Sequence, residues 1–371
     1  MVRMSTSLSD IWQHLQRQLF PILLDELGEL TDKDRQFVEV LSLLPLGPFL
    51  QPYLWQGIGR KPEERVWILH AFIAKAVYRF PTTRALLDAL RARPVLRRLC
   101  GWERLDDIPK EWTFSRAFAA FAQGELPQRI HAALIHKHRP DRLVGHVSRD
   151  ATAIEGYERP APKPAPSPRP SPPCKRGRPR NGEVRAPVPP KRLDLQPGRS
   201  LAENLADLPR VCNIGCKRNS KGHQETWIGY KLHLDVIDGD IPVSAILTSA
   251  SVHDSQVAIP LAQMTAARVT SLYDLMDSAY DAPAIHEYAR RLGHVPIIDP
   301  HSRRAEAMPL DPAQQERFKQ RSASERVNSQ LKENFGGRFV RVRGAAKVMA
   351  HLMLGLIVLT ALRLFAWVGA G

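Results

Sequence analysis

Residues 159–199 place the strongest limit on how this chain can fold. They hold 13 of the 31 prolines in the 371-residue sequence. Proline lacks a backbone N–H and fixes its own φ, so neither a helix nor an interior strand can run through such a segment. The same residues carry 11 basic and two acidic side chains, which predicts an extended or disordered basic linker. Regular structure must therefore form separately before and after it.

A short basic motif, KRGRPR at residues 175–180, lies within this linker. In an extended conformation it can lay the guanidinium groups of Arg176, Arg178 and Arg180 along a narrow minor groove, as AT-hook peptides do. A tether that only neutralises phosphates accounts for the same residues equally well. Under either interpretation the linker contacts DNA.

The net charge limits the kinds of binding partner to be expected, and the cysteine content indicates the cellular compartment. Lys and Arg number 53 against 38 Asp and Glu, which gives a net charge of +15 and a pI near 10.0. This balance predicts a polyanionic partner, with nucleic acid ahead of an acidic membrane surface. Four cysteines are too few for a disulfide framework in so long a chain, so a reducing cytoplasm is expected. Charged residues interrupt the apolar pattern of residues 7–30, so no secretory signal is expected.

The apolar segment at residues 352–368 raises the question of a membrane span. Its 17 residues are fewer than the roughly 20 that a spanning helix needs. Arg363 lies inside the segment and would cost about 2.5–3.5 kcal/mol or more in lipid. The sequence therefore predicts a helix buried against a sheet and no membrane partner. A basic protein anchored in a membrane by this segment is the weaker alternative.

Residues 1–135 are expected to form an all-helical N-terminal domain for DNA binding or assembly, with Thr82 or Thr83 capping one helix. A further helix is expected to run through Phe121. Apolar residues recur at helical spacing over 15–30, 34–44, 62–77 and 83–90. The arginines of this region form either a DNA-reading face or the solvated face of a helical bundle. They are Arg84, Arg91, Arg93, Arg97, Arg98, Arg104 and Arg116.

The pattern changes to strands after residue 140. A strand rich in Val and Ile is predicted over 143–154, with Asp150 near its C-terminal end. Further strands are predicted over 228–238, 241–249, 270–276 and 294–298, with helices over 256–268 and 281–292 and a loop over 299–316. Residues 140–370 are therefore expected to be a second, α/β domain, a mixed sheet flanked by helices and interrupted by the linker.

Residues 317–335 predict one amphipathic helix. At 3.6 residues per turn, Phe318, Arg321, Glu325 and Lys332 fall on one narrow stripe. An acid flanked by two bases is either a set of surface pairs, which stabilise a helix by about 0.2–0.5 kcal/mol each, or a catalytic carboxylate with phosphate-binding neighbours. The remainder of the chain favours the catalytic interpretation.

Three acids that are distant in the sequence can meet in such a fold. Asp150 and Asp277 each lie at the end of a predicted strand, and those ends converge if the two strands are neighbours. Carboxylates without Cys or His select Mg²⁺ or Mn²⁺. We therefore expect Asp150, Asp277 and Glu325 to hold two such ions, roughly 3.5–4 Å apart, for phosphoryl transfer. Arg321 and Lys332 would hold DNA phosphates beside them.

These motifs resemble insertion-sequence DDE transposases, which have a ribonuclease H-like catalytic domain and the signature Tyr-(2)-Arg-(3)-Glu-(6)-Lys. Phe318, Arg321, Glu325 and Lys332 match its spacing throughout, with Phe in place of Tyr. The family's Asp-x-Thr is matched by DAT at residue 150, and its Asp-x-Gly-Tyr-Asp by DSAYD at residue 277. The stretches GYKLH at 229 and HDS at 253 are also similar. Residues 65–122 resemble the helical N-terminal region of the same enzymes.

The resemblance implies an enzyme that binds the terminal inverted repeats of its own element, cleaves the ends and joins them to target DNA. It also implies a homodimer on double-stranded DNA, in the bacterial cytoplasm with the nucleoid. Lys231 would contact DNA, while Phe318, Thr152 and Tyr280 would support the site. A catalytically inactive DNA-binding protein derived from such an enzyme is the alternative, and the missing hydroxyl at Phe318 is the feature in its favour.

Other polar residues near these motifs are expected to have structural roles. Asp254 could be a further metal ligand, but the favoured prediction is that its carboxylate caps the helix that follows it. His233 and His253 are predicted to be hydrogen-bonded scaffold, because two-metal phosphoryl transfer needs no histidine base. Cys212 and Cys216 have poor spacing for zinc and lack a full ligand set, so no zinc site is expected.

Overall fold

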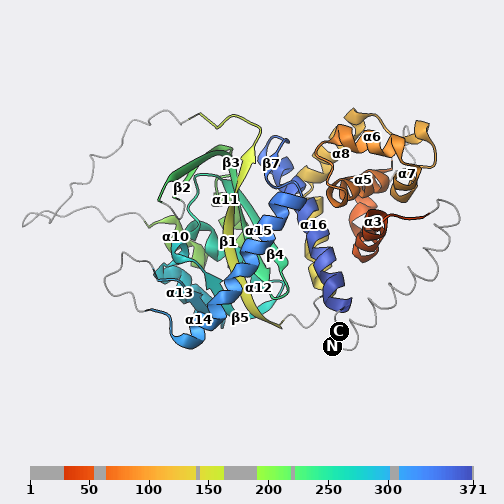
Figure 1. Cartoon of the computed structure of the whole chain (residues 1–371). Coiled ribbons are helices and arrows are strands. Elements are labelled where there is room, and N and C mark those ends of the chain that lie inside the picture. The colour runs from red at the N-terminus through yellow and green to blue at the C-terminus, as the bar shows by residue number, and fades with distance from the viewer. Residues whose placement is uncertain are drawn as a thin grey trace, which may run out of the picture.

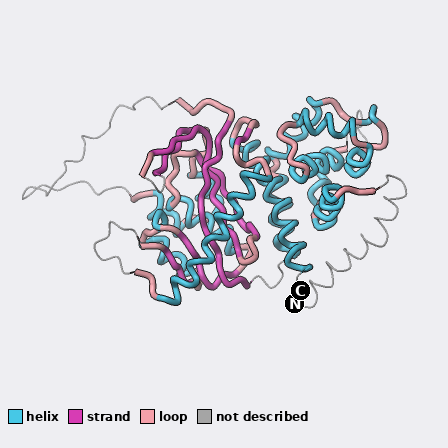
Figure 2. Tube along the Cα trace, in the orientation of Figure 1, coloured by secondary structure: helices cyan, strands magenta, loops and turns pink. Residues whose placement is uncertain are grey.

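The computed structural model describes residues 29–53, 64–138, 143–162, 190–218, 222–300 and 309–369. Figures 1 and 2 show a set of helices from the N-terminal part beside a sheet that helices flank. The long helix α16 (Ala345–Gly369) lies between the two. The KRGRPR motif and the helix predicted before residue 29 lie outside the described residues.

The N-terminal part is helical, as predicted. Thr82 caps α6 by accepting a hydrogen bond from the Ala85 N–H at 3.1 Å. The sequence interpretation missed α7 and α9; α7 begins at Pro94 and ends before Gly101, whose φ of +118° suits glycine. The helices are α3 (Asp32–Leu43), α4 (Gly47–Leu50), α5 (Arg65–Val77), α6 (Thr83–Ala92), α7 (Pro94–Cys100), α8 (Glu111–Gln123) and α9 (Leu126–His138), with short 3-10 turns at Gln51–Tyr53 and Leu105–Asp107.

The sheet is mixed and has the predicted ribonuclease H-like arrangement. Its main order is β4–β3–β1–β5–β6, in which β3 is antiparallel to β1 and β4, and β5 and β6 run parallel to β1. The unpredicted β2 pairs with the first half of β3, and β7 pairs with the end of β1. The strands are β1 (Leu143–Gly156), β2 (Asn213–Arg218), β3 (Gln224–Ile237), β4 (Ile241–Ser249), β5 (Thr270–Met276), β6 (Val295–Ile298) and β7 (Phe339–Val340).

Helices cover both faces of this sheet. The helix α15 packs against β1 and β3, and α12 packs against β3, β4 and β5. Figure 1 shows α15 crossing in front of β1. The helices of this part are α10 (Arg192–Leu195), α11 (Leu201–Asp207), α12 (Ser255–Ala266), α13 (Pro283–Arg291), α14 (Pro312–Phe318), α15 (Ser322–Asn334) and α16, with 3-10 turns η4 (Gln196–Gly198), η5 (Ser278–Tyr280) and η6 (Lys319–Arg321).

Two local predictions are wrong. The C-terminal end of the proline-rich segment is ordered into α10 and η4, because Arg192 pairs with Asp207 at 2.7 Å and the Gln196 amide donates to the Gln256 carbonyl at 2.6 Å. The loop predicted up to residue 316 already contains α14, whose cap, Asp311, accepts from the backbone N–H of residue 314. Partners distant in sequence, or a local cap before a proline, outweigh low helical propensity here.

The apolar C-terminal segment is a core helix. By length and composition Ala345–Ala366 could cross a membrane, but 72% of its most apolar window is buried inside the protein. The helix packs against β4, as predicted, and also against α5, α8 and α9. Arg363 at its far end lies 3.5 Å from Asp240. One hydrophobic cluster therefore joins the N-terminal helices, α16 and the edge of the sheet.

Candidate active site

Two of the three predicted acids come level with each other at the end of β5. The last residue pair in the parallel pairing of β1 with β5 is Ser148 with Leu275. Asp150 and Asp277 each lie two residues beyond this pair, Asp150 within β1 and Asp277 directly after β5, so the register brings the two acids level with each other. Asp277 then turns the chain, because its carboxylate accepts a hydrogen bond from the Ala279 N–H at 3.0 Å. Asp150 lies within β1 rather than at its end, since β1 continues to Gly156.

The third acid comes from α15, which the sheet holds over Asp150. The Ser148 hydroxyl lies 2.8 Å from both the Arg321 carbonyl oxygen and the Ser324 hydroxyl. The predicted single helix over 317–335 is in fact α14, one 3-10 turn and α15 in sequence. The backbone angles at Phe318, Arg321 and Ser322 lie in the right-handed helical region, so the chain keeps a helical course through that turn.

Arg321 stands between the first and third acids. Its guanidinium is 2.7 Å from Glu325 and 3.9 Å from Asp150. Because one planar guanidinium reaches both carboxylates, their nearest oxygens lie within about 9 Å of each other. Side-chain exposure differs sharply, at 19% for Asp150 and 58% for Glu325. Asp150 and Asp277 therefore form the floor of the site, and Glu325 lies at its open rim.

The two floor carboxylates are electrostatically unfavourable. Burial raises the pKa of Asp150 to about 6, and Asp277 and Asp254 add to that rise while Arg321 opposes it. Burial also raises the pKa of Asp277, with Arg321 and the Ala279 N–H acting against it. Clustered acids with raised pKa values are typical of functional sites.

Asn328 is a site residue that the sequence interpretation missed. Its amide donates to the second oxygen of Asp150 at 3.0 Å, and its own carbonyl oxygen is buried with no hydrogen-bond partner among the described residues. The hydroxyl of Tyr280, near Asp150, Asp277 and Asp254, is likewise buried with no partner in the part of the chain that the structure describes. The signal for Asn328 was present, because it lies seven residues after Arg321 and so on the same helix face.

Asp254 joins this cluster instead of capping α12. Its side chain makes no cap hydrogen bond, so the favoured capping role is wrong, while the ligand alternative stays a prediction. It accepts from the Lys231 ammonium at 2.9 Å, and that ammonium also donates to the Val252 carbonyl at 2.9 Å. The side chain of Lys231, which the sequence predicted to contact DNA, is only 14% exposed and forms its ion pair within the protein. The scaffold role of His233 fits its 3.0 Å bond to the Thr248 hydroxyl.

The remaining residues of the stripe lie along α15 in both directions. Phe318 is partly buried, with its ring centroid 5.9 Å from the Arg321 guanidinium carbon. Lys332 lies about three turns beyond Arg321, half-buried, and burial lowers the pKa of its ammonium. Thr152 is buried in β1 opposite Leu232 and lies two residues past Asp150.

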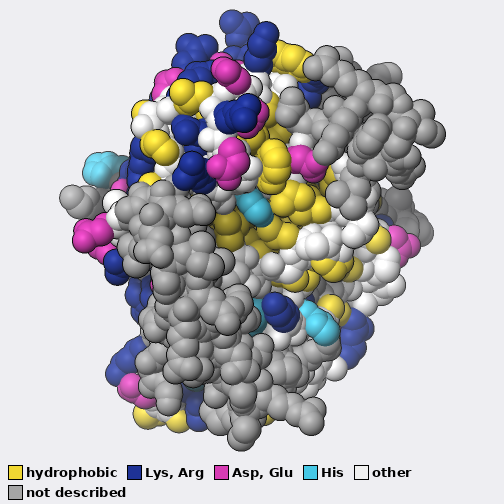
Figure 3. Space-filling view, turned by 90° about the vertical axis from the view of Figure 1, so that its right-hand side faces the viewer, with side chains coloured by type: hydrophobic (Ala, Val, Ile, Leu, Met, Phe, Trp, Pro, Cys, Tyr) yellow, Lys and Arg dark blue, Asp and Glu magenta, His cyan; other side chains and the backbone are white. Residues whose placement is uncertain are grey.

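The arginines of the N-terminal helices do not form one uniform basic face. Arg97 is buried and donates to the Leu90 carbonyl at 3.3 Å, so it does not belong to any surface. Several of the others are paired with acids, as Arg98 is with Glu103 at 3.1 Å and Arg93 with Asp34 at 3.4 Å. Figure 3 shows Lys and Arg gathered at the upper end of this side of the molecule, with acids among them.

The residues of the site fit a divalent cation in chemistry, although they are not assembled around one. Within the described residues, no three Asp, Glu, His or Cys side chains are close enough to hold a metal ion together. All the possible metal ligands are oxygen atoms. They are the carboxylates of Asp150, Asp277 and Glu325 and the side-chain carbonyl of Asn328, which has no partner among the described residues. Such hard donors suit Mg²⁺ or Mn²⁺.

Two family models match the chain. The Transposase DDE domain matches residues 210–361, and the Transposase domain (DUF772) matches residues 25–120. The first match contains Asp277 and Glu325, whereas Asp150 lies between the two. A search of curated proteins and of solved structures found no significant match. Two transposase domains in order, on a ribonuclease H-like sheet whose acids converge, place this chain among the insertion-sequence DDE transposases.

Proposed function

We propose that this transposase binds the terminal inverted repeats of its element, cleaves the DNA at the element ends and joins those ends to target DNA. The observation that carries the proposal is the convergence of Asp150 and Asp277 beneath the helix that presents Arg321 and Glu325. The net charge of +15 supports DNA as the partner. We expect the protein to act as a homodimer on DNA in the bacterial cytoplasm.

Asp150, Asp277 and Glu325 would hold two Mg²⁺ or Mn²⁺ ions, which supply a nucleophile and stabilise the leaving oxygen in an in-line displacement at phosphorus. Asp150 and Asp277 are already fixed by the strand register. Arg321 neutralises Glu325 in the free protein and, once released, its guanidinium is placed to bind a phosphate. Asn328 orients Asp150 through its amide, and Lys231 balances the charge of Asp254.

Metal-dependent nicking of supercoiled plasmid tests this proposal. Asp150→Ala, Asp277→Ala and Glu325→Ala should each abolish nicking with Mg²⁺ or Mn²⁺ while DNA binding stays near the wild-type level. Glu316→Ala, which removes an exposed acid paired only with Lys319 on the neighbouring turn, serves as the matched control and should keep activity. Full nicking by any of the three active-site variants would refute the assignment of that residue.

An inactive DNA-binding protein derived from a transposase is the second candidate. Phe318 lacks the hydroxyl that the family signature places there, and Glu325 is committed to Arg321 in the free protein. This candidate predicts retained DNA binding with no nicking at any Mg²⁺ or Mn²⁺ concentration. Phe318→Tyr separates the two, because gain of nicking on restoring the hydroxyl would identify a damaged enzyme rather than a dedicated binding protein.

A further inference from the structure

A cavity of about 400 Å³ lies between the N-terminal helices and the end of α15, away from the acids. The end of α5 and the turn after it form one wall. The end of α15, the segment around β7 and the adjoining turn of α16 form the other. Five cations line the cavity, and Glu333 is its single acid among the described lining residues. The cations are Lys75, Arg79, Lys332, Arg338 and Arg341.

Most of this positive charge is uncompensated. Glu333 is paired with Arg338, so the one acid in the lining is already used. The side chains of Lys75, Arg79, Lys332 and Arg341 make no hydrogen bond or ion pair with the residues that the structure describes. Like charges held together without a counter-ion repel, so a cavity with this lining favours an anion.

Among these cations, Lys75 is the one whose charge is most strongly destabilised by burial without a counter-charge. Lys75 lines the cavity together with Phe72 and Phe118, whose side chains are buried, and burial lowers the pKa of its ammonium to about 8. The nearby His351 is held neutral by burial and by Lys75, which lower its pKa to about 4. A buried ammonium without a partner costs free energy that an anionic oxygen would recover.

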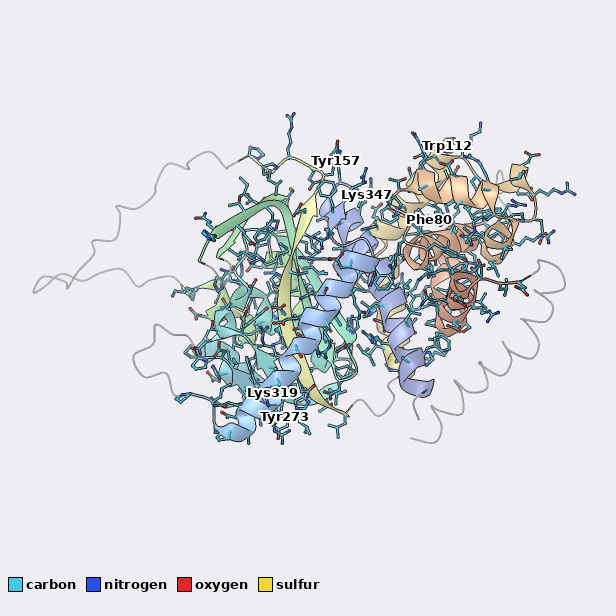
Figure 4. All side chains as sticks on the ribbon, viewed as in Figure 1. Phe80, Trp112, Tyr157, Tyr273, Lys319 and Lys347 are labelled. Carbon is cyan, nitrogen blue, oxygen red and sulfur yellow. The ribbon has the colours of Figure 1, made fainter. Side chains whose placement is uncertain are left out.

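Aromatic and basic side chains continue from the cavity onto the surface around its mouth. Phe339 lines the cavity, is 46% exposed and lies edge-on to Tyr157, with ring centroids 6.1 Å apart. The Arg343 guanidinium lies over the Tyr157 ring at 5.4 Å. Figure 4 shows Tyr157 on the sheet side and Phe80 on the helical side of the junction between the two parts. Exposed rings interleaved with cations are typical of nucleic-acid sites.

Lys332 connects this cavity to the candidate active site. It lies on the same helix stripe as Glu325, and seven residues of α15 span about 10 Å. Along one DNA strand that distance corresponds to about three nucleotides. Burial, Lys217 and Arg338 lower the pKa of Lys332, whereas Glu155 and Asp150 raise it, so Lys332 interacts with charges of both the site and the cavity. A phosphate chain leaving the active site along α15 would therefore reach the cavity.

We propose that the cavity binds the sugar–phosphate backbone of DNA, a few nucleotides from the reacting phosphate. The cations bind phosphate oxygens, and the Lys75 ammonium gains a counter-charge. Residues of the N-terminal helices and of the catalytic sheet then contact one strand together. The position relative to the cut depends on the proposed function, whereas the requirement for an anion comes from the cavity itself.

The test compares the full-length protein with a Lys75→Gln, Arg341→Gln double variant, which leaves Lys332 and the acids intact. Lys137→Gln, an exposed cation on α9 outside the cavity lining, is the matched control. Binding of a short linear duplex of arbitrary sequence is measured in EDTA over a salt series. The slope of log K against log salt should fall by about two in the double variant, since each lost phosphate contact removes about 0.9. The control should keep the wild-type slope.

An unchanged slope in the double variant, or a duplex that fails to bind the wild type, would overturn the proposal. So would saturable binding of inorganic phosphate that duplex DNA does not displace, because the cavity would then be a small-anion site. The double variant should unfold at or above the wild-type thermal midpoint, because Lys75 has no partner among the described residues to lose and its buried charge is removed. Should it unfold, Arg341→Gln alone, at an exposed position, must lower the slope by about one. DNA binding with the expected slope but without nicking would refute the proposed function and leave the cavity assignment standing.

Discussion

At the scale of single residues, Asp150 is the side chain of the site whose charged form is most strongly disfavoured by its surroundings. Burial, Asp277 and Asp254 all favour its protonated form, and Arg321 at 3.9 Å only partly offsets them. The amide of Asn328 fixes one oxygen of this carboxylate. The free protein therefore holds an acid that gains stability when a cation arrives, and this has consequences for pH and for stability.

Nicking should increase as the pH rises through about 6, because Asp150 must lose its proton before it can bind a cation. Rates at fixed Mg²⁺ across a pH series centred on that value would show the transition. A higher Mg²⁺ concentration should move the midpoint to lower pH, since the cation competes with the proton. A flat profile across the series would contradict a titrating Asp150.

Asp150→Asn should stabilise the metal-free protein at neutral pH. The folded pKa of Asp150 is raised from 3.8 to about 6, so its folding stability falls as the pH rises through this window and stays lower above it. Removing the charge should recover on the order of 1–3 kcal/mol of unfolding free energy. Thermal unfolding with and without Mn²⁺ measures this. Mn²⁺ should stabilise the wild type and leave the variant unchanged; stabilisation of both by Mn²⁺ would exclude Asp150 as a ligand.

At the scale of elements, α15 is positioned by its two ends. Ser148 in β1 holds its beginning at Arg321 and Ser324. Its far end rests on α16 at Gly355, where a Cβ would come within 2.8 Å of the Phe335 carbonyl oxygen. The angle of α15 over the sheet, and so the position of Glu325, depends on both contacts.

Gly355→Ala should therefore destabilise the protein, although alanine is the better helix former. Overpacking of this kind costs about 1–3 kcal/mol, and the shift of α15 should also reduce nicking. Gly47→Ala is the matched control, because a Cβ there meets nothing within 4 Å. Chemical unfolding of both variants gives the comparison. Equal or greater stability of the Gly355 variant would mean that α16 adjusts without moving α15.

At the scale of the whole molecule, the hydrophobic core does not divide near residue 140. One cluster contains side chains from α3 to α9, from β1 and β4, and from α16. A second contains β1, β3, β4, α15 and the other side of α16. The two-domain division drawn from the sequence stays a prediction, and α16 belongs to both cores.

The full-length protein should consequently unfold in one calorimetric transition, because α16 couples the helices to the sheet. A chain that ends at residue 344 should lose helical structure in the N-terminal part as well, which circular dichroism would record. Two well-separated transitions in the full-length protein would show that the helices and the sheet fold independently.

The sequence by itself determined most of the elements of this protein and which residues are the candidates for its chemistry. Period-two and period-3.6 patterns located β1, β3 to β6 and most helices, and the spacing from Phe318 to Lys332 identified the face of α15 that carries the site. These signals are local, because each pattern is set by side chains that lie within a few residues of one another in the sequence. They failed at β2, α10 and the cap of α12, where partners from elsewhere decide the outcome.

The tertiary structure decided which of those side chains meet. It aligned Asp150 with Asp277 by strand register, placed Arg321 between Asp150 and Glu325, and brought Asp254 and Asn328 into the same cluster. It also gathered cations from α5, α15 and the β7 segment around one cavity, most of them without an ion pair to any described residue. Contacts between distant residues depend on the packing of whole elements, so burial and charge balance at a site are not readable from residue types in order along the chain.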